Sequence, residues 1–94
     1  MARYSYTVVF WKHHEDPGTV CAAVPACRGC NDDGVDLAEA RRDIAASLAF
    51  WLEVLRDDGE AFPEDVAVET RPGDPYEKTW GTVVAVETVT VTLD

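Results

Sequence analysis

The sequence predicts an α+β fold in which one long helix packs on one face of a small antiparallel sheet, in the order β-β-β-α-β. Only residues 36–58 carry apolar side chains at helical spacing. The stretches before and after them are rich in alternating β-branched and aromatic residues, which favour strands. Glycine, proline, asparagine and aspartate separate these stretches, as is typical of turns. Residues 1–94 are expected to form a single domain, since a chain of this length holds one modest core.

The first two strands are predicted to form a hairpin. Residues 4–11 alternate between a core-facing set, namely Tyr4, Tyr6, Val8 and Phe10, and an opposite set, namely Ser5, Thr7, Val9 and Trp11. Residues 12–18 contain Asp-Pro-Gly, which favours a reversal of the chain there. Residues 19–24 then return as the second strand.

The helix follows a turn-rich segment. Residues 25–34 hold a proline, two glycines and turn-forming Asn and Asp, which leaves room for a short third strand around residues 29–32. Asp36 caps the helix, and Glu39 completes a capping box three residues later. Gly59 suits the left-handed residue that ends a helix. The predicted core stripe consists of Leu37, Ala40, Ile44, Leu48, Trp51 and Leu55.

The chain beyond the helix is predicted to be extended and irregular before one last strand. Residues 65–69 suggest a brief extended piece, residues 71–81 a loop with two prolines, and residues 82–93 the final strand.

The final strand changes phase. Val84 and Val86 share one parity, whereas Val89, Val91 and Leu93 share the other. A bulge near residues 87–88 would reconcile the two sets. The alternative is a strand that is apolar on both faces, with one half meeting another chain.

The charge of the chain limits its partners. Eighteen acidic residues against eight basic ones give a net charge of −10, which would repel a phosphate backbone, so we expect no direct binding of nucleic acid. The acidity can serve solubility, the recruitment of a basic partner, or both. No apolar run reaches the ~18 residues of a membrane span, and the N-terminus lacks the apolar core of a signal peptide. We therefore expect a cytoplasmic protein that does not enter a membrane.

The three cysteines are interpreted as structural. Cys27 and Cys30 form a C-x-x-C pair, which alone could be half of a zinc site or a redox pair. His13 and His14 could complete a zinc site, but their spacing does not aim both of them at the cysteines. A thioredoxin-like strand and helix do not follow the pair. We expect no metal and no cofactor, with zinc and redox chemistry as the alternatives.

A series of short segments runs from the first strand to just past the helix. It comprises Tyr6-Thr7-Val8-Val9-Phe10, residues 20–24, Pro25-Ala26-Cys27-Arg28-Gly29-Cys30, residues 37–40, and Asp57-Asp58-Gly59-Glu60 followed by Pro63. In this order and spacing the series, within residues 4–68, resembles the HicB antitoxin family. The resemblance implies a partial ribonuclease-H-like β-β-β-α-β domain. Full-length members commonly append a DNA-binding segment, whereas the residues after Gly81 form one valine-rich strand, so we expect no operator binding by this chain.

A ribonuclease-H-like fold also raises an enzyme hypothesis. Two-metal hydrolysis would need a carboxylate on the first strand, and residues 4–11 contain neither Asp nor Glu. Glu39, Asp43 and Glu53 fall mostly off the apolar stripe of the helix and should face solvent. For nucleophilic catalysis, no third residue is placed to orient the histidines toward a cysteine. We therefore expect no enzyme and no catalytic residue.

Binding remains as the expected activity. The resemblance implies that the partner is a small, basic HicA-type toxin that cleaves messenger RNA, and that this chain neutralises it by covering its active surface. The alternative is a stand-alone homo-oligomeric module without a toxin. Self-association as a homodimer or higher even oligomer is predicted through the open sheet face and the last strand. The predicted partner-binding residues are Val9, Trp11, Val89, Val91 and Leu93.

Overall fold

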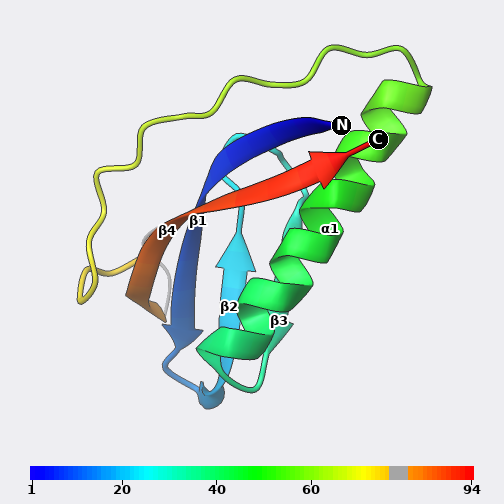
Figure 1. The fold of residues 1–94 in the computed structure, drawn as a ribbon. Coiled ribbons are helices and arrows are strands. Elements are labelled where there is room, and N and C mark those ends of the chain that lie inside the picture. Colours follow the sequence, from blue (N-terminus) through cyan, green and yellow to red (C-terminus); the bar gives the residue numbers. More distant parts are fainter. Residues whose placement is uncertain (77–80) are drawn as a thin grey trace.

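The computed structural model of this protein describes residues 1–76 and 81–94. Along this part of the chain the elements are β1 (Ala2–His13), β2 (Asp16–Ala23), β3 (Asn31–Gly34), α1 (Leu37–Asp57) and β4 (Gly81–Leu93). The four strands form one antiparallel sheet in the order β3-β2-β1-β4, and α1 packs against one of its faces (Figure 1). The predicted α+β class and the order β-β-β-α-β are confirmed.

The hairpin of β1 and β2 is confirmed, and its turn lies within the predicted residues 12–18, although before Pro17 and Gly18 of the Asp-Pro-Gly signal. The chain reverses at residues 14–15, because His13 already pairs with Asp16. The register then shifts, and regular pairing resumes with Trp11 opposite Cys21. Pro17 lies within this irregular part of β2, where a residue without an amide hydrogen loses no ladder bond. The proline therefore marks a bulge after the turn.

The helix begins and ends close to where the sequence predicts. Asp36 is the N-cap, and its Oδ1 accepts from the Glu39 amide at 2.8 Å. The Glu39 carboxylate in turn accepts from the Val35 amide at 3.2 Å, one residue before the Asp36 amide that a capping box would use. At the other end Gly59 has φ +70°, and its amide donates to the Arg56 carbonyl at 3.0 Å. Both helix ends are thus satisfied by neighbours in the sequence.

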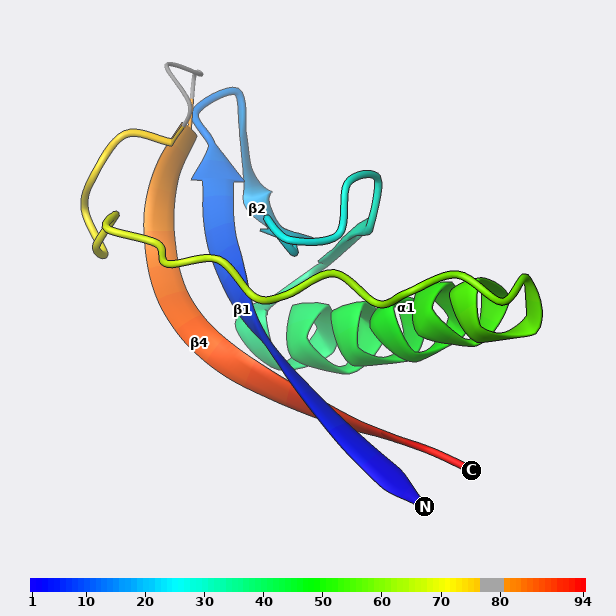
Figure 2. The same cartoon turned by 90° about the horizontal axis from the view of Figure 1, so that it is seen from above.

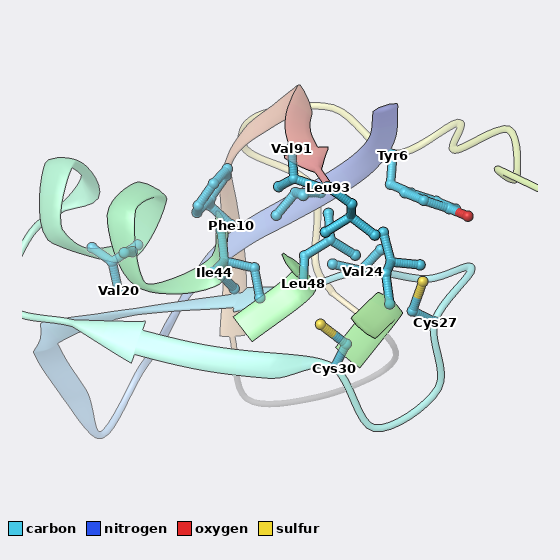
Figure 3. Close-up of a cluster of buried hydrophobic side chains, with 14 residues drawn as sticks. Tyr6, Phe10, Val20, Val24, Cys27, Cys30, Ile44, Leu48, Val91 and Leu93 are labelled. Atoms are coloured by element: carbon cyan, nitrogen blue, oxygen red, sulfur yellow. The ribbon is translucent and has the colours of Figure 1, made fainter. Parts of the chain in front are cut away.

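The main core lies between α1 and the sheet. Ile44, Leu48 and Leu52 are fully buried on α1, and Leu37, Trp51 and Leu55 of the predicted stripe pack at its margin. Figure 3 shows how strand and turn side chains meet those of the helix. The buried residues of this cluster are Tyr6, Val8, Phe10, Val20, Ala22, Val24, Cys27, Cys30, Ala40, Ile44, Leu48, Leu52, Val91 and Leu93.

β4 has a bulge, but at a different residue from the one predicted, and the bulge does not cause the phase change: pairing is regular from Ala85 to Leu93, so Val86 and Val89 lie on opposite faces and β4 is apolar on both. Phe10 pairs with Ala85 and Trp11 with Val83, which leaves Val84 as the extra residue, three positions before the predicted 87–88. From Ala85 onward the odd-numbered residues face α1, as the Arg41–Glu87 ion pair shows. Val83 consequently faces the opposite side, together with Val86.

The segment after α1 packs along the sheet before it reaches β4. The Tyr6 hydroxyl donates to the Pro63 carbonyl, and the Asp65 carboxylate accepts from the amide and the hydroxyl of Thr7, at 2.9 and 2.8 Å. The chain then passes to the side of the sheet away from α1, as the yellow trace in Figure 2 shows. Residues 65–69, predicted as a brief extended piece, belong to no helix or strand. Of the predicted loop 71–81, residues 77–80 lie outside the described residues.

Among the described residues, no helix is both long enough and apolar enough to cross a membrane.

Candidate partner-binding surface

Two predicted partner-binding residues, Val9 and Trp11, lie on the sheet face away from α1. Val9 is only 1% exposed, and Trp11 is half-buried because its ring stacks on Tyr76, with centroids 4.5 Å apart and planes 25° apart. Tyr76 reaches this face because residues 73–76 pair with the start of β4: the Gly73 amide donates to the Val83 carbonyl at 2.8 Å. The face that the sequence leaves open is therefore partly covered by the chain itself.

The other three predicted residues lie on the face toward α1. Val91 and Leu93 are buried in the main core, and Val89 packs against it half-buried. The five residues thus divide between two faces of the sheet, and their side chains are largely used within the protomer. A contact with another chain would have to use other groups, such as the outer edge of β4 or the parts of the outer face that remain open.

One part of the outer face does remain hollow. A groove of about 850 Å³ lies over β1, β2 and β3, with Tyr76 at one end and the turn of residues 24–29 beside it. The strand register shows which residues form the floor of the groove. Trp11 lies opposite Cys21, and Cys21 lies opposite Asp33. Ala23 and Asn31 form the next row in the same register.

The groove has an acidic end. Asp32 and Asp33 both line it, and Arg28 is the cation that lines it among the described residues. The Asp32 carboxylate is held by the Ser47 hydroxyl of α1 and accepts from the Asp33 amide at 2.9 Å. Asp33 itself is exposed, so its carboxylate is the one that a ligand can reach. The pKa of the Cys21 thiol is raised, first by burial and then by the negative charges of Asp33 and Asp16.

Cys27 and Cys30 are buried thiols in the main core. The turn that holds them is tight, with the Cys27 amide donating to the Val24 carbonyl at 3.0 Å and the Cys30 amide to the Cys27 carbonyl at 2.9 Å. Burial is the largest cause that raises the pKa of Cys27 to about 12 and that of Cys30 to about 11. Thiols of this kind are poor nucleophiles, because nucleophilic attack needs the thiolate.

The residues weighed for hydrolysis are not brought together. Glu39 is engaged in the helix cap, and Glu53 is exposed on α1. Among residues 1–76 and 81–94, no group of three or more His, Cys, Asp and Glu side chains is positioned to hold a metal ion. His14 instead shares a hydrogen bond of 2.9 Å with the hydroxyl of Thr82. Absence of metal binding stays a prediction, to be tested by elemental analysis.

Sequence reasoning missed most of the groove. The alternation of the first strand placed Trp11 on the open face of the sheet. Tyr76 lies 65 positions later, and no sequence pattern connects it with Trp11. Cys21 could have been placed beside Trp11 from the hairpin, had the turn been assigned to residues 14–15. Asp33 could be placed there only once the register of β3 was known.

Comparison of this chain with protein-family models, with curated proteins and with solved structures gave no match.

Proposed function

We propose that this protein is an antitoxin-like binding protein of the HicA/HicB type, which neutralises a small, basic, mRNA-cleaving toxin by covering its active surface. The observation that carries the proposal is the order of elements. The resemblance implied a β-β-β-α-β domain, and the chain has that order, with its helix capped at Asp36 and ended at Gly59. The net charge of −10 also supports it, since an acidic chain attracts a basic toxin and competes with RNA for the same surface.

A binding role is favoured over catalysis by the chemistry of the described side chains. β1 carries no carboxylate, and the two cysteines that the sequence singled out are buried with raised pKa values. We expect the purified protein to cleave neither RNA nor DNA with magnesium or manganese. Cleavage that persists through further purification, and that disappears when an acidic residue of this chain is replaced, would contradict a pure binding role.

The direct test uses the reading frames beside the gene. A neighbouring frame that encodes a small basic protein would be expressed alone and together with this chain. We expect growth arrest from the neighbour alone and rescue by co-expression, with the two proteins purifying as a complex. A neighbour that arrests growth equally with and without this chain would refute the proposal.

The alternative function is a stand-alone homo-oligomeric module, and one observation favours self-association. Along residues 84–93 the outer edge of β4 receives no backbone hydrogen bond from another described segment, and this stretch contains neither lysine nor proline. Such an edge invites pairing with another strand, and pairing with a second copy about a two-fold axis closes the assembly. Light scattering at micromolar concentration tests this: a monomer of 10.3 kDa would exclude it, and Thr90→Lys should dissociate a dimer.

A further inference from the structure

The groove over β1–β3 places an aromatic surface and a carboxylate along one row of the sheet. Trp11, Cys21 and Asp33 are neighbours in register across the three strands. Adjacent strands lie about 4.8 Å apart, so the two ends of the row are separated by roughly 10 Å at the backbone. Both side chains extend from the same face and reach several ångströms from the backbone, so one group of a ligand that lies between them can contact both ends.

The aromatic end is a flat, polarisable surface. Trp11 and Tyr76 both line the groove and stack nearly parallel, which holds the indole in one orientation. A cation over the face of a tryptophan is attracted by the negative charge density of the ring, and the attraction grows as water is excluded. The hollow beside the stack therefore suits a planar cation better than an anion.

The opposite end supplies the negative charge. Asp33 is exposed and lines the groove, whereas Asp32 is oriented by Ser47. The chain as a whole carries a net charge of −10, so the field around the groove adds to the local attraction for a cation. Arg28 at the turn offsets part of this charge, and the Asp33 carboxylate is the acidic group that a ligand in the groove can reach.

We propose that this groove binds an arginine side chain of a basic partner protein, with the guanidinium stacked on Trp11 and hydrogen-bonded to the Asp33 carboxylate. A guanidinium is planar, weakly hydrated and able to donate two parallel hydrogen bonds to a carboxylate, whereas an ammonium group acts as a point charge. An arginine side chain can therefore interact favourably with both Trp11 and Asp33. A lysine side chain interacts more favourably with Asp33 than with Trp11. The inference rests on the proposed function, because it names the group by which the basic toxin would be recognised.

The test uses a short probe that carries one cation. Isotope-labelled protein is titrated with acetyl-Gly-Arg-Gly-amide, and the lysine peptide of the same design serves as the comparison. We expect chemical-shift changes at Trp11, Cys21 and Asp33 and tighter binding of the arginine peptide. Asp33→Asn should weaken arginine binding about tenfold, since it removes a charge-assisted hydrogen bond.

The matched control is Glu53→Gln, which makes the same charge change at an exposed position of α1, on the other side of the sheet. It should alter affinity by less than about twofold, because a remote exposed charge is screened by salt. Equal losses from the two variants, or equal affinity for the arginine and lysine peptides, would overturn the proposal.

The outcome can be separated from that of the proposed function. If the toxin test succeeds and Asp33→Asn neutralises the toxin at full strength, the groove assignment fails while the antitoxin role stands. If the arginine peptide binds in the groove but no neighbouring toxin is neutralised, the groove assignment stands and the antitoxin role fails.

Discussion

Replacing Leu48 with alanine tests the assignment of the core most directly. Leu48 is fully buried at the centre of α1, with the fully buried Ile44 and Leu52 one turn away on either side. The substitution removes three carbon atoms from a close-packed site and leaves a cavity between the helix and the sheet. Losses of this kind cost about 2–5 kcal/mol.

That loss is large for a domain of this size, whose total stability should be about 5–14 kcal/mol at 94 residues. The assay is urea unfolding followed by far-ultraviolet circular dichroism, in which the midpoint should fall while the slope stays constant. Val54→Ala is the matched control, because it truncates an aliphatic side chain on the same helix that is 43% exposed. Its cost should stay below about 1 kcal/mol. Equal costs for the two variants, or an Arg42→Ala cost as large as that of Leu48→Ala, would refute the stripe assignment.

Three further outcomes follow from particular contacts. Asp65→Ala removes the acceptor for the Thr7 amide and hydroxyl and should cost about 0.5–1.5 kcal/mol in urea melts; an unchanged midpoint would contradict the docking of this segment on β1. Because burial raises its pKa to about 12, Cys27 should be alkylated far more slowly in the native state than in urea, and equal rates would place it at the surface. The hydrogen bond from Arg41 lowers the pKa of Glu87 below its ordinary 4.5, so the stability advantage over Glu87→Gln should be present above pH 4.5 and disappear as the pH falls through the lowered pKa; an advantage that persists at pH 2 would contradict this.

The elements themselves could be predicted because their determinants are local. The α1 stripe repeats every three to four residues, and Asp36 and Gly59 act on backbone groups within one turn of themselves. The alternation of β1 likewise identified Tyr6, Val8 and Phe10 as core residues, and all three are buried against the helix. These features depend on neighbours in the chain, so the sequence alone determined them.

The exact residues of the hairpin turn and of the β4 bulge could not be predicted, because their positions depend on strand register. Asp-Pro-Gly is a strong turn signal, yet pairing of His13 with Asp16 moves the reversal to residues 14–15. Similarly, pairing of Trp11 with Val83 decides that Val84 is the extra residue. A register is a set of contacts between strands, so a single stretch of sequence cannot specify it.

The candidate site depended on tertiary structure more than any other feature. The sequence determined that the face of β1 bearing Val9 and Trp11 is apolar and that the chain is acidic, but local patterns do not state what covers a face. The path of the segment after α1 decides that Val9 is buried and that Tyr76 stacks on Trp11. The order of the strands decides that Asp33 shares a row with Trp11. The physical reason is that periodicity and capping act over a few residues, whereas a groove is formed by segments that meet only when the whole chain has packed.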